Sequence, residues 1–548
     1  MKKIVYFILF ILAISACDVL DLNPLDKISE ADAWNDQALI EVYVNGNYIA
    51  LPHGYRQDVL GARCEELYSI HNWGNGYPVL QGTMTPDNIA NLGPTGANDI
   101  GNINYWSSAY RHIRNINIFF EKIDDSPVDL DFKNRVVGEM KFLRAYIYAN
   151  LIWRHGGVPL ITKVYQLNED YSVTRNSYDE CVDFIVRELD EAIHLLPAKQ
   201  PAAQLGRASG DACQALKARV LLYAASTLNN PDHNTSKWQK AADAAEALLG
   251  KYILLDDYQS VFLADNNEII FARSMTQASS PEYNRWVARN GSSGQGGNTP
   301  TQNVVNAFEM AATGEMPYVE QADGSLTLNT ASGFDPEDPY TGRDPRFYAS
   351  ILYDGSFWQG RNTESWRGGI DSPENPMSGW DASQTSYYLK KFLDEKIPPT
   401  GSTERSKSPW IWFRYAEVLL NYAEAKFELG DENTARQYLN MVRSRKSVNM
   451  PPVTDTGENL RKRIHNERRV ELVFEEHRFF DVRRWKIAMS TETQDVTSMY
   501  ITKLPDDTKT YEHRMLSKRA FSEQHYLLPI PRAEVDRSLG SLAQNPGY

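Results

Sequence analysis

Apolar residues at helical spacing over two long stretches limit the possible folds of this chain more than any other feature. Between about 104 and 255 these residues recur every three or four positions, for example at 113–120 and 142–151, which is the pattern of amphipathic helices. The second of these helices should stop at Gly156. Further helices are predicted at 177–196, 209–227, 238–249, 410–429, 431–446 and 458–477. The chain is therefore predicted to be mainly α.

Small residues recur where paired helices must approach each other closely. Ala423 and Ala435 flank Gly430, and these match the small-residue and interhelical-turn positions of a tetratricopeptide unit. Ala192 followed by Pro197 is typical of the end of such a unit. We therefore predict a tetratricopeptide-like helical-repeat scaffold over about 30–270 and 410–548.

The segment 281–409 interrupts this scaffold. It holds 11 of the 27 prolines and 14 of the 33 glycines in 129 of 548 residues, a density that breaks helices and favours loops and short strands. Long irregular insertions on a rigid frame are commonly where binding surfaces are built. We predict that 281–409 is a loop-rich insertion that forms the ligand face of a single domain, 17–548.

The first seventeen residues indicate that the protein is exported from the cytoplasm. Two lysines precede an unbroken apolar run at 4–14, and small residues then lead to Cys17. The run is shorter than the ~18 residues that a membrane helix needs and is typical of a secretory signal. Small residues before a cysteine resemble the lipobox of bacterial lipoproteins. We expect residues 1–16 to be a lipoprotein signal peptide and Cys17 to be the acylated N-terminus; an ordinary signal peptide is the alternative.

Charge narrows the choice of partner. The formal net charge is -14, and the chain has no long block of Lys and Arg. Such a chain repels phosphate backbones, which argues against a nucleic-acid partner. An uncharged or polar ligand is expected.

The remaining cysteines are Cys64, Cys181 and Cys213. Their spacing supports neither a disulfide framework nor a zinc site. Buried free thiols are expected, with one long-range bridge as the alternative.

The motifs of common enzymes are missing from the sequence, which contains no H-E-x-x-H, G-x-S-x-G or phosphate-binding G-x-x-x-x-G-K-[ST]. A glycosidase would need two carboxylates at the scissile bond, and the densest carboxylate cluster is Glu467, Glu471, Glu475 and Glu476. Interleaved arginines favour structural ion pairs instead; these are Arg468, Arg469 and Arg478. Asp335, Asp338 and Asp344 could hold calcium through oxygen ligands, but they lack the spacing of a calcium loop. We predict no enzyme, metal or cofactor.

Short motifs occur in order over nearly the whole chain: FLRAY at 142–146, GGVPL at 156–160, RYAEVLL at 414–420, ERR at 467–469, HRFFD at 477–481 with RW at 484–485, LPIP at 528–531 and QNPGY at 544–548. Together they resemble the SusD/RagB family of nutrient-binding surface lipoproteins. The resemblance implies one helical domain on tetratricopeptide-like pairs, with the insertion as ligand face. It also implies a partner, a TonB-dependent outer-membrane transporter of the SusC type.

Sugar recognition needs flat aromatic faces together with amide or charged groups. Two loops have this mixture and correspond to the ligand loops that the resemblance implies. Their candidate glycan-binding residues are Asn72, Trp73, Asn75 and Tyr77 in the first loop, and Tyr283, Arg285, Trp286 and Asn290 in the second. A packing role is the alternative for Trp73 and Trp286.

Other tryptophans divide into two groups. Trp358, Trp366 and Trp380 are further binding candidates that also fit local loop cores, whereas Trp106, Trp153, Trp238 and Trp485 lie in or beside helical patterns and are predicted core residues.

The sequence therefore predicts a non-catalytic, lipid-anchored outer-membrane protein that faces the cell surface. It would bind an oligosaccharide and pass it to a SusC-type transporter. The alternatives are a peptide-binding lipoprotein of the same fold, as the RagB branch suggests, a surface glycosidase and a purely structural helical scaffold.

Overall fold

The structure is a computed structural model, and it describes residues 30–72, 75–92, 100–169, 172–275, 283–321, 325–400 and 406–548. The predicted signal peptide, Cys17 and Trp73 lie outside the described residues. The predictions for these three therefore remain predictions.

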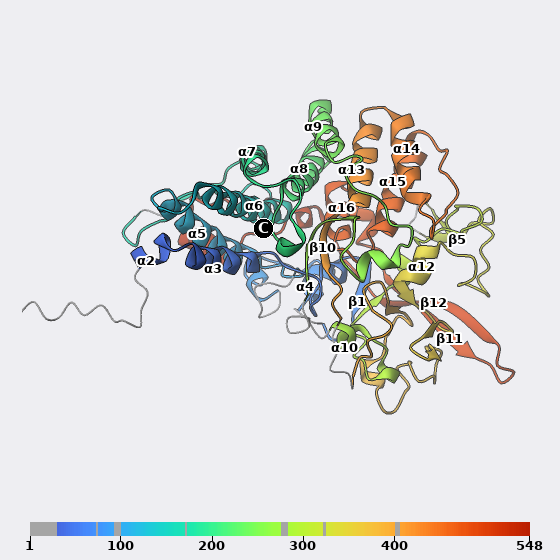
Figure 1. Cartoon of the computed structure of the whole chain (residues 1–548). Coiled ribbons are helices and arrows are strands. Elements are labelled where there is room, and N and C mark those ends of the chain that lie inside the picture. Colours follow the sequence, from blue (N-terminus) through green and yellow to red (C-terminus); the bar gives the residue numbers. More distant parts are fainter. Residues whose placement is uncertain are drawn as a thin grey trace, which may run out of the picture.

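Helices dominate the described chain, as predicted (Figure 1). The longer ones are α3 (Gln37–Asn47), α5 (Trp106–Ile123), α6 (Leu130–His155), α7 (Tyr178–Leu195), α8 (Gly210–Ala225), α9 (Thr235–Glu246), α13 (Tyr415–Glu428), α14 (Glu432–Arg443) and α15 (Gly457–Glu471). The shorter ones are α2 (Glu30–Asn35), α4 (Tyr77–Leu80), α10 (Tyr283–Val287), α11 (Gln302–Val305), α12 (Pro345–Ser350), α16 (Arg478–Arg484), α17 (Ala488–Thr491) and α18 (Arg532–Arg537).

Helices α6 to α9 and α13 to α15, which we call the helix stack, pack in antiparallel pairs. Ser177 and Glu180 form a capping box that starts α7, and Asp431 caps α14. Gly430 occupies the turn between α13 and α14 with φ +83°, a conformation that glycine adopts without strain. Ala423 and Ala435 are fully buried. The predicted tetratricopeptide-like pairing is confirmed here.

The stack continues across the insertion. Although some 170 residues separate them in sequence, α9 packs directly against α13, and Figure 1 shows α9, α13, α14 and α15 side by side. Buried apolar side chains from Ile40 to Leu542 form one large contiguous cluster. The core therefore passes through both halves of the chain.

Two predicted helix boundaries are wrong. Residues Trp410–Arg414 form strand β10, not the start of a helix. All five are buried, and all except Trp412 pair with residues of β2 (Ile269–Arg273). Their aromatic and β-branched side chains suit a strand, and the helical signal began only at Tyr415. At the other end, α15 stops at Glu471 because Phe474 and Glu476 have φ of 63° and 68°, which a helix cannot accommodate.

The strands of the described residues form two-stranded antiparallel sheets. Besides β2 with β10, these are β1 (Leu67–Ser69) with β3 (Asn298–Pro300), β4 (Tyr318–Glu320) with β5 (Leu326–Leu328), β6 (Ile351–Leu352) with β9 (Tyr388–Leu389), β7 (Phe357–Trp358) with β8 (Arg361–Asn362), and β11 (Val496–Lys503) with β12 (Lys509–Ser517). The hairpin of β11 and β12 projects from the body of the protein (Figure 1).

The described parts of 283–400, which we call the loop region, contain only short elements. The longest helix among them is α12, with 6 residues. This is the loop-rich character predicted from proline and glycine.

A buried ion network joins the loop region to the helix stack. Glu471 on α15 accepts hydrogen bonds from Arg414 (2.7 Å), Arg445 (3.0 Å) and Arg346 of α12 (3.0 Å). Lys391 of the loop region donates to Glu475 at 2.7 Å. Burial alone would raise the pKa of Glu471, but Arg445, Arg414 and Arg346 together lower it below its ordinary value.

Three of the four clustered glutamates form ion pairs as predicted, but not with the interleaved arginines, and Glu476 instead accepts from the amides of Leu60 and Gly61. The interleaved arginines point elsewhere: Arg468 pairs with Asp481, and Arg469 and Arg478 pair with Glu65. The partners of the cluster come from distant segments, Arg346, Lys391, Arg414, Arg443 and Arg445. Spacing along one helix could not show this.

Cys64, Cys181 and Cys213 are buried and free. The predicted free thiols are confirmed, and no bridge links the three. Trp106, Trp153, Trp238 and Trp485 are buried, as predicted.

Candidate functional site

Pairing of β1 with β3 brings the two predicted ligand loops together. Ser69 lies opposite Asn298, and the amide of Ile70 donates to the carbonyl of Gly297 at 3.0 Å. The loop that follows β1 and the loop that precedes β3 must therefore lie at the same end of this ladder. The sequence separates them by more than 200 residues.

A third segment, the turn at Gly379–Asp381, packs against the second loop. Gly296 has φ +48°, and a Cβ there would lie 2.4 Å from the carbonyl oxygen of Asp381. Only glycine combines this backbone conformation with so close an approach. The absence of a side chain at position 296 therefore allows Trp380 to reach the predicted ligand loops.

A group of mixed chemistry results, which we call the Trp380 face: the exposed Trp380 and Arg285, the partly buried His71, and the buried Asp381 beneath them. The Trp380 side chain is 73% exposed, and its ring centroid lies 6.1 Å from that of His71. His71 Nε2 lies 3.1 Å from Asp381 Oδ1 and 3.1 Å from the carbonyl of Gln295. Arg285 is exposed and acts electrostatically on Asp381. Tryptophan, which combines a large apolar ring with a polar N–H, is enriched at interfaces.

Electrostatics at the Trp380 face depend on Asp381. Burial raises the pKa of Asp381 above its ordinary value, while His71 and Arg285 act in the opposite direction. The carboxylate of Asp381 and the carbonyl of Gln295 both contact the same ring nitrogen of His71, Nε2. These contacts fix the ring beside Trp380.

Three of the predicted binding residues are buried, and we leave them out of the candidate site. Tyr283 is 6% exposed and lies in an aromatic cluster with Tyr55 and Phe392. Trp358 is 3% exposed. The amide of Asn290 donates to the carbonyls of Ile370 and Ser378, and its oxygen accepts from Tyr388. Packing inside the protein covers the rings of Tyr283 and Trp358, and internal hydrogen bonds occupy the amide of Asn290, so none of the three is open to a ligand.

The other candidate residues that the structure describes are neither part of the Trp380 face nor fully withdrawn into the core. The Asn72 side chain accepts from the amide of Gly76 at 2.9 Å and so closes its own loop, while Asn75 is exposed and Tyr77 is 37% exposed on the same loop. Trp286 and Trp366 are partly buried and pack against the core. For these residues a binding role stays a prediction, as it does for Trp73.

Neither carboxylate cluster named from the sequence offers an open site. Glu467, Glu471 and Glu475 are buried and ion-paired. Asp344 is buried against Arg346 and caps α12, so it is not available to a calcium ion. No group of three or more potential metal-ligating side chains was found among the described residues.

Trp380 was a secondary candidate from the sequence, and the structure places it beside His71 and above Asp381, which were not among the candidates. From the sequence, the glycine-rich surroundings of Trp380 are as compatible with packing inside a loop as with ligand binding. Its exposure follows from the contact between Gly296 and the 379–381 turn, which pairs residues some 85 positions apart. No local signal carries that information.

Comparison with known proteins decides the family. A family model described as "SusD family" matches residues 261–548. The chain belongs to the SusD family. A second model, described as "Starch-binding associating with outer membrane", matches residues 18–222. The resemblance seen in the sequence motifs is thereby confirmed.

Solved structures of the SusD family have the same fold. A SusD-like protein from Bacteroides fragilis is 30% identical, with a TM-score of 0.78 over 96% of this chain and 100% of that chain. A SusD-like carbohydrate binding protein from the same organism is 24% identical, with a TM-score of 0.75 over 93% and 99%. SusD-like protein P25 of Formosa agariphila is 23% identical over 100% of this chain and 99% of its own. The tetratricopeptide-like fold prediction is confirmed.

The lipid anchor of this SusD-family chain is not tested by these matches. Among the described residues, none of the helices combines the length and apolar character needed to cross a membrane.

Proposed function

We propose that this SusD-family protein is a non-catalytic surface lipoprotein that captures an oligosaccharide at the Trp380 face. The observation that carries the proposal is the indole ring of Trp380, 73% exposed beside His71 and Arg285. Relatives of the same fold include a SusD-like carbohydrate binding protein and a laminarin binding SusD-like protein, 24% and 23% identical. They support a saccharide as the ligand class.

Capture would follow from the chemistry of the face. The flat indole covers the apolar C–H side of a pyranose ring and releases water from both surfaces. Arg285 and His71 would supply polar groups for the ring hydroxyls, and the buried Asp381 would hold His71 in position. Because Glu467, Glu471 and Glu475 are buried and ion-paired and Glu476 is buried against backbone amides, the bound sugar would leave unchanged.

Delivery is the second half of the proposal. Acylation of Cys17 would hold the protein at the outer membrane, and a TonB-dependent transporter of the SusC type would receive the sugar. The description of the family model that matches 18–222 supports the membrane association. A diacylglyceryl group buries two acyl chains at ~0.8 kcal/mol per CH₂, which suffices for stable anchoring.

Substitution of Trp380 tests the binding site. In isothermal titration with the best ligand of a glycan and peptide panel, Trp380→Ala should weaken binding about tenfold or more, since ~1.4 kcal/mol is tenfold and the ring contributes area and stacking. The melting temperature should stay the same because the ring is exposed. Met515→Ala, 57% exposed on β12, is the matched control. Equal affinity of both variants, or binding of peptides alone, would contradict the proposal.

Lipidation is tested separately. Cys17→Ala should abolish labelling by a lipid precursor and release the protein from membranes, whereas Cys64→Ala, which removes a buried thiol, should leave labelling intact. Persistent labelling of Cys17→Ala would show that the lipobox interpretation is wrong.

A further inference from the structure

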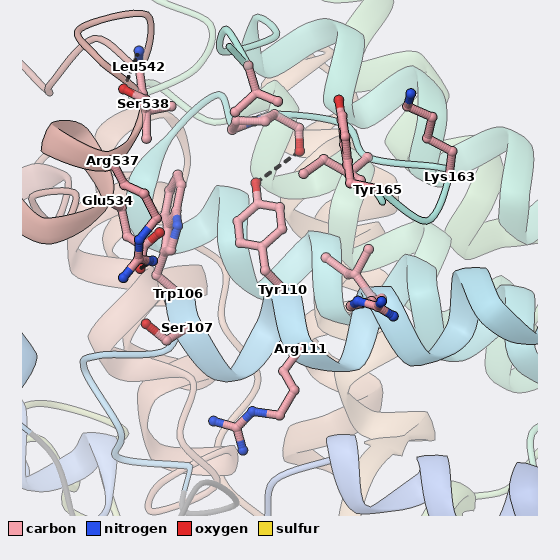
Figure 2. A pocket seen from close by; sticks show the side chains of 15 residues that line it. Trp106, Ser107, Tyr110, Arg111, Lys163, Tyr165, Glu534, Arg537, Ser538 and Leu542 are labelled. Atoms are coloured by element: carbon pink, nitrogen blue, oxygen red, sulfur yellow. Dashed lines mark hydrogen bonds and ion pairs between the residues drawn. The ribbon is translucent and has the colours of Figure 1, made fainter. Parts of the chain in front are cut away.

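A pocket of about 540 Å³ lies between α5, the segment that follows Gly157, and α18 with the residues beyond it (Figure 2). Small-molecule sites typically have volumes of roughly 300–1,000 Å³. None of the residues of the Trp380 face lines this pocket. It is therefore a second, separate concavity.

Hydrogen bonds fix its three walls relative to one another. The hydroxyl of Tyr110 on α5 donates to the carbonyl of Pro159 at 2.9 Å, a contact drawn in Figure 2. Asn117 donates to the carbonyl of Ile161 at 3.0 Å, and Ser541 donates to the carbonyl of Val173 at 2.9 Å. Because these bonds tie the three walls to one another, binding would require little reordering of the walls.

Aromatic and apolar side chains form the floor. Tyr110 and Tyr165 are partly buried, and Trp106 lies beside Tyr110 with the two ring centroids 5.1 Å apart. Pro159 and Ile161 complete this surface. Such a floor suits the apolar face of a ring-shaped ligand.

Cations surround the floor. Arg111, Arg114, Lys163 and Arg537 line the pocket together with a single carboxylate, Glu534. Figure 2 shows Arg537 near Trp106, Lys163 near Tyr165, and Arg111 extending from α5 in a different direction from Tyr110. Arg537 pairs with Glu534 at 2.8 Å, and Lys163 pairs with Glu169 at 2.9 Å. No ion pair of Arg111 or Arg114 is found within the described part of the chain. On a protein of net charge -14, this local excess of positive charge favours an anion.

We infer that this pocket binds an acidic saccharide, with a carboxylate of a uronic acid at Arg111 and Arg114 and a sugar ring on Tyr110 and Tyr165. Charge-assisted hydrogen bonds from guanidinium groups are the strongest that a carboxylate makes, and the exposed serine and charged side chains at the rim suit hydroxyls. The site goes beyond the proposed function, since it neither includes nor requires the Trp380 face.

Trisaccharides of galacturonate and of glucuronate are the probes, titrated into the full chain at low salt. The methyl ester of the galacturonate trimer keeps its skeleton and removes its charge. We expect at least one acidic trimer to bind, the ester to bind at least tenfold more weakly, and added salt to weaken binding of the acid.

Variants then locate the site. Arg111→Gln with Arg114→Gln should weaken binding of the acid at least tenfold, whereas Arg187→Gln with Lys240→Gln, exposed on α7 and α9, changes the net charge equally and should have no effect. Trp380→Ala should retain acid binding. The inference is overturned if no acidic trimer binds, if the ester binds equally well, if the arginine variant matches its control, or if Trp380→Ala abolishes binding of the acid.

Discussion

The helix stack and the loop region are held together by different kinds of contact. In the helix stack, small residues such as Ala423 and Ala435 are fully buried and let helices pack closely, so its order rests on apolar packing. In the loop region, side chains such as Asn290 and Asp371 bind backbone groups of neighbouring turns. The difference shows how one frame can carry varied binding surfaces, because loops held by local polar contacts can change without repacking the core.

The two regions meet in the buried ion network around Glu471. This carboxylate binds Arg414 and Arg445 of the frame and Arg346 of the loop region. It is therefore the point at which a single substitution could separate the regions.

Glu471→Gln should have the largest effect. Removal of the charge leaves three buried arginines without their shared partner, and breaking a buried pair in this way costs about 3 to 5 kcal/mol. Urea unfolding measures the loss, and limited proteolysis should show earlier cleavage within 283–400. Glu458→Gln on the same helix is the control, since the Glu458 side chain is 70% exposed and such pairs contribute about 0 to 1 kcal/mol. Equal stability of the two variants would mean that the network does not couple the regions.

Asn290→Ala should have an intermediate effect confined to the loop region. The substitution leaves the carbonyls of Ile370 and Ser378 without this donor, at about 1 to 3 kcal/mol for unsatisfied buried groups. Hydrogen exchange should speed up near 370–388 and stay unchanged in α13 and α14. Asn267→Ala is the control, because Asn267 is exposed and makes no side-chain hydrogen bond to the described residues. Faster exchange throughout the stack would contradict the separation of the two regions.

Glu476→Gln should have the smallest effect at pH 5, where the protonated carboxyl is neutral like the amide, and its consequence should appear as a change with pH. Glu476 accepts from the amides of Leu60 and Gly61, and burial raises its pKa from 4.5 to about 8. Between these values the folded state holds a proton that the unfolded state has lost, so stability falls as pH rises, on the order of 1 kcal/mol per pH unit. The glutamine variant should show a flatter profile from pH 5 to 8 in urea unfolding. An unchanged slope would show that Glu476 is not the source.

Much of the helix stack could be predicted from the sequence. The turn glycine at 430, the stop at Gly156 and the buried tryptophans are local or periodic features, and periodicity reports which face of a helix is buried. The errors occurred where tertiary contacts override local preference. Trp410–Arg414 became a strand because β2 offers a partner, and α15 ended early because Glu476 turns to bind the amides of Leu60 and Gly61.

The candidate site was predictable only as a pair of loops. Sequence composition identified aromatic and amide side chains near 72–77 and 283–290, but exposure depends on what packs against each ring. The ring of Tyr283 packs against Tyr55 and Phe392 in the core. The ring of Trp380 lies edge-on to His71 and is largely exposed to solvent.

The sequence by itself determined the helical frame, the loop-rich insertion and the family, because periodicity, proline and glycine content, and ordered motifs are properties of the chain. Only the tertiary structure decided which aromatic rings are exposed and which arginines neutralise Glu471. Those outcomes depend on contacts between residues far apart in sequence, such as Gly296 with Asp381 and Arg346 with Glu471, and the free energy of such contacts is set by distance and burial, not by position along the chain.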